Sequence, residues 1–139
     1  MDRISAGGGI LIFVRESITA VELRDIPMSE GFEGISIELN FNNKKWFLLG
    51  TYNPSKTNLV PFLFNCNKIL EHYTTKYENI IVLGDFNIEE SDSKIKDFMI
   101  EFGLKNLIKE KTCYKSPKNP SYIDLILTNK PRSFKTALL

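Results

Sequence analysis

The sequence predicts a mixed α/β fold, and three patterns in it point to that class. Short apolar runs and alternating apolar and polar segments are typical of strands. Two longer stretches carry apolar residues every three or four positions, as one face of a helix does. The predicted order is strand, strand, strand, helix, strand, helix, strand, and a turn between the second and third strands predicts an antiparallel pair.

The first half of the chain accounts for three of these strands. Residues 10–14 form a short apolar run after three glycines and are predicted as a buried strand. Residues 34–41 alternate, as a half-buried strand does. Asn42 and Asn43 tolerate positive φ, so they predict a hairpin turn into a returning strand at residues 46–52.

A helix and a central strand follow. Apolar residues spaced by three and four predict a helix over residues 57–77, with Cys66 on its apolar face as a packing residue. His72, the one histidine of the chain, is predicted on the surface of this helix. The β-branched run at residues 80–83 predicts a central strand.

The last part of the chain predicts a helix, a loop and a strand. Ser91 or Ser93 is expected to cap the helix, and Gly103 is expected to end it. The lysine-rich residues 105–120 are predicted as a long surface loop. Residues 122–128 predict the final strand.

Length and composition limit the class of protein. With 139 residues, 42% hydrophobic and 25% charged, the chain predicts about one globular domain rather than a disordered protein. The net charge of +1 does not indicate a polyanionic partner. No run reaches the ~18 apolar residues of a membrane helix and no segment resembles a signal peptide, so we expect an intracellular protein without a membrane partner. Cys66 and Cys113 suit a reducing compartment, and a disulfide between them stays open.

Asp85 and Asn87 are the first candidates for chemistry. They flank Phe86 directly after the predicted central strand, where loops commonly carry functional groups. In extended chain their side chains would point the same way and could hold a metal-bound water or phosphate oxygens. The alternative is that this Gly-Asp-Phe-Asn stretch is turn chemistry alone.

Asp124 and Tyr52 are the next candidates. Asp124 interrupts an apolar strand, and a buried carboxylate needs a cation, an imidazole or a metal as its partner. The alternative is an edge strand with Asp124 facing water. Tyr52 closes its strand, where its phenol could bind a phosphate oxygen or simply cover the core.

Four stretches, taken in order, resemble the endonuclease/exonuclease/phosphatase superfamily, and within it the endonuclease domain of non-LTR retrotransposons. They are residues 7–14 (GGGILIFV), 50–55 (GTYNPS), 80–87 (IIVLGDFN) and 121–129 (SYIDLILTN). The resemblance implies a four-layer α/β/β/α sandwich. It also implies hydrolysis of phosphodiesters or phosphate esters with Mg²⁺, or with Mn²⁺ as the alternative ion.

The resemblance also implies roles for individual residues. Asp85 would orient the attacking water or protonate the leaving oxygen, and Asp124 would orient a catalytic histidine. Asp85 and Asn87 would contribute to the metal site. The substrate would be contacted by Tyr52, Asn53, Asn87 and Thr112.

The chain departs from the family pattern at both ends. The family's metal-binding glutamate lies upstream of the glycine-rich strand, and its Ser-Asp-His element lies about where this sequence stops. We therefore expect residues 1–139 to form a single partial domain. The resemblance implies a DNA endonuclease that works in the nucleus, with two alternatives: a non-catalytic remnant or residual nucleic-acid binder, and a phosphatase acting on a phosphoinositide or other lipid.

Overall fold

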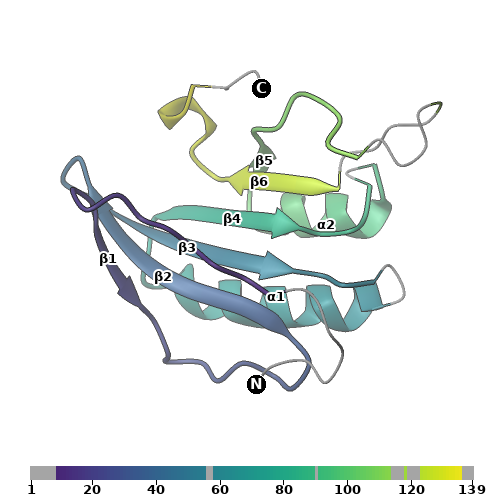
Figure 1. Cartoon of the computed structure of the whole chain (residues 1–139), viewed down its shortest axis with the longest axis horizontal. Helices are drawn as coiled ribbons and strands as arrows, with labels where there is room; N and C mark the ends of the chain where they lie inside the picture. Colours follow the sequence, from purple (N-terminus) through teal and green to yellow (C-terminus); the bar gives the residue numbers. More distant parts are fainter. Residues whose placement is uncertain (1–8, 56–57, 90, 114–117, 119–122, 136–139) are drawn as a thin grey trace.

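The described part of the chain folds into one mixed sheet with helices packed against one of its faces. The computed structural model describes residues 9–55, 58–89, 91–113, 118 and 123–135. Its strands are β1 (Thr19–Glu22), β2 (Glu33–Phe41), β3 (Lys44–Tyr52), β4 (Asn79–Asp85), β5 (Lys105–Asn106) and β6 (Asp124–Thr128). Its helices are α1 (Leu59–Tyr73), α2 (Ser93–Glu101) and a short 3-10 helix, Pro131–Ser133. The strand order is β1-β2-β3-β4-β6-β5, with β3 and β4 parallel and the other neighbours antiparallel (Figure 1).

One face of the sheet, the helix face, packs against both α1 and α2. Alternate residues of the central strands, such as Phe47 and Val82, meet Cys66 of α1 and Phe98 of α2 in the larger hydrophobic cluster. The apolar residues spaced by three and four therefore form the buried side of α1, as predicted. The helix is shorter than the predicted range of 57–77, because it ends at Tyr73. Burial raises the pKa of the Cys66 thiol, which packs as a small hydrophobe.

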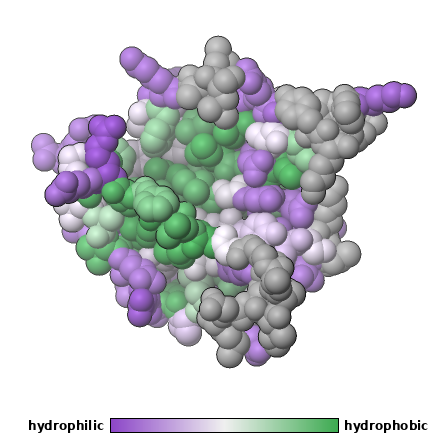
Figure 2. Space-filling view, viewed as in Figure 1, coloured by the Kyte–Doolittle hydropathy of each residue, from purple (hydrophilic) through white to green (hydrophobic). Residues whose placement is uncertain are grey.

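The other face of the sheet, the second face, carries a smaller cluster. Its buried members are Ile37, Leu39, Trp46, Leu48 and Ile81. Figure 2 views this face and shows hydrophobic side chains gathered over the middle of the sheet. The α/β prediction is confirmed. Of the four layers that the resemblance implies, the described residues form one sheet and one layer of helices.

The predicted buried strand at residues 10–14 is wrong. These residues form no strand and cross the second face as an irregular segment (Figure 1). Ile12 packs so closely on Gly50 that a Cβ added to the glycine would lie 2.6 Å from the Ile12 side chain. Leu11 and Phe13 point outward and are 76% and 88% exposed. The run is apolar because one side covers the sheet, but no described strand pairs with its backbone.

The hairpin prediction is confirmed, whereas the edge strand before it was missed. Asn42 and Asn43 have φ of 52° and 58°, as the tight turn between β2 and β3 requires. The missed strand β1 pairs with β2, and all four of its residues are exposed. Because neither side of β1 is buried, its sequence carries no alternating pattern.

The cap of α2 is Asp92, so the prediction of Ser91 or Ser93 is wrong. The Asp92 carboxylate accepts a hydrogen bond from the Lys94 amide at 2.8 Å. A carboxylate at this position also interacts favourably with the helix dipole. Gly103, with φ of 64°, follows the helix as predicted.

The predicted loop at residues 105–120 begins with a strand. Lys105 and Asn106 form β5 and pair with β6. The buried Asn106 side chain accepts from the amides of Ile108 and Ile126, at 3.1 Å and 3.3 Å. Such a short strand leaves too few residues to reveal a period. Cys113, in the same stretch, and Cys66 are both free thiols.

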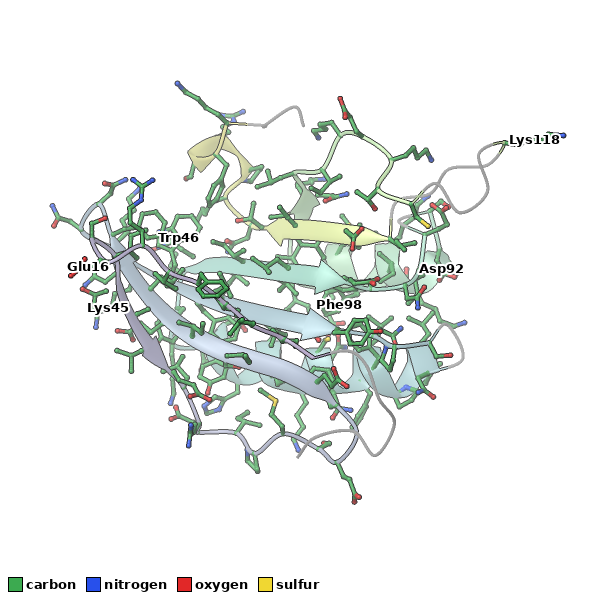
Figure 3. All side chains as sticks on the ribbon, in the orientation of Figure 1. Glu16, Lys45, Trp46, Asp92, Phe98 and Lys118 are labelled. Carbon is green, nitrogen blue, oxygen red and sulfur yellow. The ribbon has the colours of Figure 1, made fainter. Side chains whose placement is uncertain are left out.

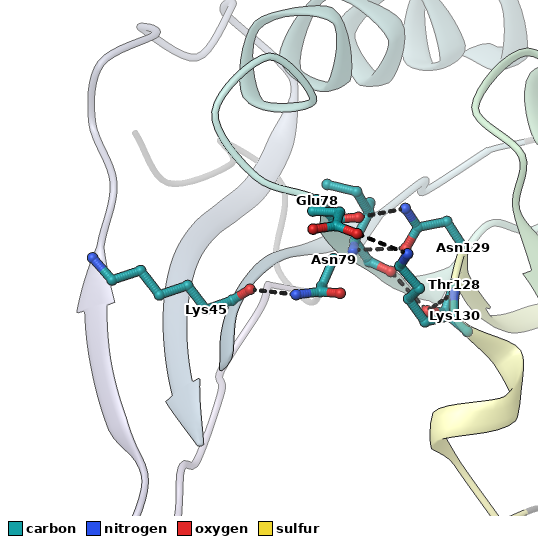
Figure 4. A network of polar contacts seen from close by, with 7 residues as sticks. Lys45, Glu78, Asn79, Thr128, Asn129 and Lys130 are labelled. Carbon is teal, nitrogen blue, oxygen red and sulfur yellow. Dashed lines mark hydrogen bonds and ion pairs between the residues drawn. The ribbon is translucent and has the colours of Figure 1, made fainter. Parts of the chain in front are cut away.

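A network of polar contacts fixes β6 at the amino end of β4 (Figure 4). The Asn129 side chain accepts from the Ile80 amide at 2.9 Å and donates to the Glu78 carbonyl at 2.8 Å. The Thr128 hydroxyl donates to the Ile80 carbonyl at 2.8 Å. The network sets the register of β6, and therefore decides what lies opposite the last residue of β4.

Candidate active site

Tyr52, Asp85 and Asp124 lie in one row across three neighbouring strands. Tyr52 is the register partner of Asp85, and Asp85 is the register partner of Asp124. All three lie on the second face, because they alternate in phase with residues such as Leu48 and Leu83. Each is half-buried. The structure thus brings together three residues that are separated by 33 and 39 positions in the sequence.

The strand directions explain why the row forms. Because β3 and β4 are parallel, their carboxyl ends meet at one edge of the sheet, where open α/β sheets commonly bind ligands. Strand β6 is antiparallel to β4, so its first residue reaches the same edge. In Figure 3, Trp46 near the start of β3 and Asp92 beyond the end of β4 lie at opposite ends of the sheet, and the row lies toward Asp92.

Gly84 gives Asp85 its place in the row. Its φ is 149°, and a Cβ built on it would lie 1.7 Å from the Thr51 carbonyl oxygen. Only glycine lets β4 approach β3 this closely at the residue before Asp85.

Asn87 lies in a turn, so the expectation of an extended Asp-Phe-Asn segment is wrong. Its φ is 53°, and its backbone amide donates to Asp85 Oδ1 at 2.9 Å. Its side-chain amide donates to the Pro54 carbonyl at 3.3 Å. The turn alternative is therefore correct in structural terms, and the same turn holds the Asp85 carboxylate and joins it to the segment after β3.

Asn53 is completely buried beside the row. Its backbone amide donates to the Asp85 carbonyl at 2.8 Å, and its side-chain amide donates to the Phe86 carbonyl at 2.9 Å. These contacts join the segments that follow β3 and β4. The geometry gives Asn53 a positioning role, and its contact with substrate stays a prediction.

Thr112 lies at the start of β6. Its hydroxyl oxygen accepts from the backbone amides of Ile123 and Asp124, at 3.2 Å and 3.1 Å. Thr112 therefore fixes the backbone that carries Asp124, and its predicted contact with substrate also stays a prediction.

Glu33 extends the row by one strand and was missed by sequence reasoning. It is the register partner of Tyr52, and its carbonyl accepts from the Thr51 hydroxyl at 2.9 Å. The signal was present in the sequence, because Glu33 is in phase with the apolar positions Ile35 and Ile37 of the same strand. We call Glu33, Tyr52, Asp85 and Asp124 the polar row.

Neither a complete metal site nor a histidine partner for Asp124 is found in the described ranges. Among these residues, no three His, Cys, Asp or Glu side chains are grouped closely enough to hold a metal ion. His72 Nε2 lies 3.6 Å from Asp25 Oδ2, on the helix side of the molecule, and its predicted position on the α1 surface is consistent with this contact.

The family of the chain follows from its sequence. Residues 46–138 match the model of the endonuclease-reverse transcriptase family. This match covers more than half of the chain, so the chain belongs to that family, and the resemblance to the endonuclease/exonuclease/phosphatase superfamily is confirmed. A search of curated proteins finds no match.

Solved structures show the same fold. The endonuclease domain of TRAS1, a telomere-specific non-LTR retrotransposon, has a TM-score of 0.62 at 13% identity, over 81% of this chain and 56% of that one. The catalytic domain of human Nocturnin has a TM-score of 0.57 at 15% identity, over 81% of this chain and 46% of that one. An endonuclease/exonuclease/phosphatase family protein from Leptotrichia buccalis C-1013-b has a TM-score of 0.54 at 20% identity, over 70% of this chain and 41% of that one. The chain therefore spans about half the length of these structures or less.

None of the helices in the described part of the chain is long and apolar enough to cross a bilayer.

Proposed function

We propose that this chain carries part of the active site of an endonuclease that cleaves DNA phosphodiesters. The observation that carries the proposal is the polar row, which lines up a phenol and carboxylates at the carboxyl ends of two parallel strands. The family match and the fold shared with the TRAS1 endonuclease domain support a nucleic-acid substrate. In a longer protein of this kind, we expect the activity to act on nuclear DNA.

Three residues of the row have a task that their chemistry allows. The Tyr52 hydroxyl donates a hydrogen bond to a phosphate oxygen. Asp85, held by the Asn87 amide, exchanges a proton with the attacking water or with the leaving oxygen. Asp124 accepts a hydrogen bond from a general base and fixes its orientation, as the aspartate of a catalytic triad does.

A divalent ion does not fit the described residues as a complete site. Mg²⁺ takes oxygen ligands in octahedral geometry and usually keeps several waters. Asp85 and Asn87 offer too few such ligands, and no three His, Cys, Asp or Glu side chains among the described residues could hold a metal ion together. A beta toxin from Staphylococcus aureus with the same fold has bound magnesium ions. Dependence on Mg²⁺ or Mn²⁺ stays a prediction for a longer protein of this family.

DNA binding by the chain tests the proposal without requiring turnover. We expect the purified chain to bind duplex DNA with an affinity that falls as salt rises. Tyr52→Phe should weaken binding by about 1 kcal/mol, the value of one hydrogen bond. Asp85→Asn should strengthen it, because it removes a negative charge next to the phosphate. Fluorescence anisotropy measures all three affinities.

The matched control is Asp97→Asn, which removes the same charge from an exposed position on α2. It should leave DNA affinity nearly unchanged. Equal effects of Asp85→Asn and Asp97→Asn, or the absence of binding, would contradict the proposed site.

Plasmid nicking separates the catalytic proposal from its alternatives. The chain alone should nick supercoiled plasmid in Mg²⁺ poorly or not at all, because the described residues lack a metal site. Strong nicking that is lost in Asp85→Ala would show that the site is complete after all. Binding without nicking, even in a longer version of the protein, favours the non-catalytic alternative. Release of phosphate from a phosphomonoester or a phosphoinositide favours the phosphatase alternative.

A further inference from the structure

A pocket of about 240 Å³ opens beside the polar row, between the start of β2 with the residues just before it, the end of β3 and the start of α1. It shares Tyr52, Glu33 and Asn53 with the candidate active site. We call it the Tyr52 pocket. A group bound in it would therefore be attached to, or lie directly beside, whatever the Tyr52 hydroxyl contacts.

Two aromatic rings form a fixed apolar wall in the pocket. The Phe32 and Phe62 ring centroids lie 5.8 Å apart. Phe62 is 5% exposed and packs edge-on against Phe86 at 5.4 Å. The Phe32 ring lies so close over Gly34 that a Cβ there would be 2.5 Å from it. Phe62 is almost fully buried and therefore supports Phe32 from behind, so a planar ligand would meet mainly the half-buried Phe32 ring, which packing sets in advance.

Polar groups occupy the rest of the lining. Asn58, just before α1, and Asn65 of α1 contribute amides, and Glu30 and Glu33 contribute carboxylates. The Asn65 amide already donates one hydrogen bond to the Pro61 carbonyl, at 2.9 Å. Asn58 occupies the N-cap position of α1 but makes no side-chain cap hydrogen bond, so its amide is not needed by the helix. Amides both donate and accept hydrogen bonds, whereas carboxylates accept them. The lining therefore suits a flat ligand with several polar edge groups, including N–H donors.

The volume of the Tyr52 pocket and the charge of its lining further limit the class of ligand. Pockets for drug-sized ligands measure roughly 300–1,000 Å³, so this smaller one suits a single ring system. Two carboxylates in the lining disfavour a phosphate inside it. The phosphate would remain at Tyr52 while an attached ring enters the pocket.

We propose that the Tyr52 pocket binds one nucleobase next to the scissile phosphodiester, and that it prefers a base with an exocyclic amino group. Base rings stack on aromatic side chains, and Glu accepts from the cytosine amino group. Guanine and adenine also carry an exocyclic amino group that donates N–H hydrogen bonds, whereas thymine has none. This inference rests on the proposed function and assigns base preference to β2, β3 and the start of α1.

Binding of short single-stranded oligonucleotides by the full 139-residue chain tests the inference. The probes are an all-thymine strand and versions with one central guanine, one cytosine or one abasic position. We expect guanine or cytosine to improve affinity about tenfold over thymine, the scale of one good base contact. Asn58→Trp fills the pocket from an exposed position and should abolish this preference, and Glu30→Gln should reduce it.

Two control variants match these substitutions away from the pocket. Asn40→Trp places the same side chain at an exposed position near the far end of β2, and Glu71→Gln removes a charge from an exposed position on α1. Both should keep the guanine or cytosine preference.

The outcomes separate this inference from the proposed function. Binding of all probes with equal affinity, or a preference that survives in Asn58→Trp, would overturn the inference and leave the proposed function standing. Failure to bind any probe while duplex DNA still binds would overturn the inference alone, whereas failure to bind the probes and duplex DNA would overturn the proposed function and the inference together. A preference that is lost only in the pocket variants supports both.

Discussion

At the scale of single residues, the polar row places carboxylates next to one another. Asp85 and Asp124 are direct register partners on the same face of the sheet. Like charges opposite each other in an antiparallel pair destabilise it. The Thr112 hydroxyl accepts a hydrogen bond from the Asp124 backbone amide, and this contact does not depend on the Asp124 carboxylate. A carboxylate at position 124 therefore does not stabilise the fold, and a role in the active site explains it better.

Asp124→Asn should leave the free energy of unfolding unchanged or raise it by up to about 1 kcal/mol, because it removes the repulsion from Asp85. Urea midpoints of the two proteins measure this, with Asp97→Asn as the control for loss of an exposed acid. Clear destabilisation would instead reveal a stabilising partner of the Asp124 carboxylate. In a longer relative with a catalytic histidine, the same substitution should strongly reduce activity.

At the scale of elements, the close contact between β3 and β4 is the feature on which the row depends. Gly84 lies directly against the Thr51 backbone, and the next residue along β4 is Asp85. Asn53 and Asn87 then join the segments beyond the two strands. A change that pushes the strands apart would therefore disturb both stability and the site.

Gly84→Ala should destabilise the chain by more than about 3 kcal/mol or prevent folding, because the new methyl group would overlap the Thr51 carbonyl. The matched control is Gly103→Ala. Gly103 also has positive φ, but a Cβ added to it would have no neighbour within 4 Å, so only backbone strain of about 1 kcal/mol is expected. Urea denaturation and soluble yield distinguish the two. Equal costs would contradict the role of close strand contact.

At the scale of the whole molecule, the two faces of the sheet differ. The helix face is covered by α1 and α2, whereas the second face carries a smaller cluster crossed by residues 10–14. Leu11 and Phe13 add exposed apolar area to this face. Large exposed apolar patches favour association.

Leu11→Ser combined with Phe13→Ser should reduce self-association of the chain without loss of stability, since both side chains are already exposed. Sedimentation velocity over a range of concentrations checks this expectation. Ile12→Ser is the contrasting variant, because Ile12 packs on Gly50, and it should lower the urea midpoint. A chain that stays monomeric at all concentrations before mutation would contradict the prediction.

Local patterns predicted most elements correctly, and the errors have physical causes. The alternation before Asn42 and the helical spacing around Cys66 required only local preference and one buried side. Strand β1 was missed because it has no buried side, and β5 because it is too short to show a period. The strand prediction for residues 10–14 was wrong because a segment that covers a sheet needs the same apolar residues as a strand inside it.

For the candidate site too, some features could be predicted from local sequence and others could not. By itself, the sequence determined the α/β class, the family, and the identity of Tyr52, Asp85 and Asp124 as unusual residues, because turn chemistry and an acid in an apolar strand are local signals. Only the tertiary structure decided that these residues form one row and that Glu33 belongs to it. Strand order and register bring residues together across the sheet through backbone hydrogen bonds, which every residue type can make, so no local pattern specifies them.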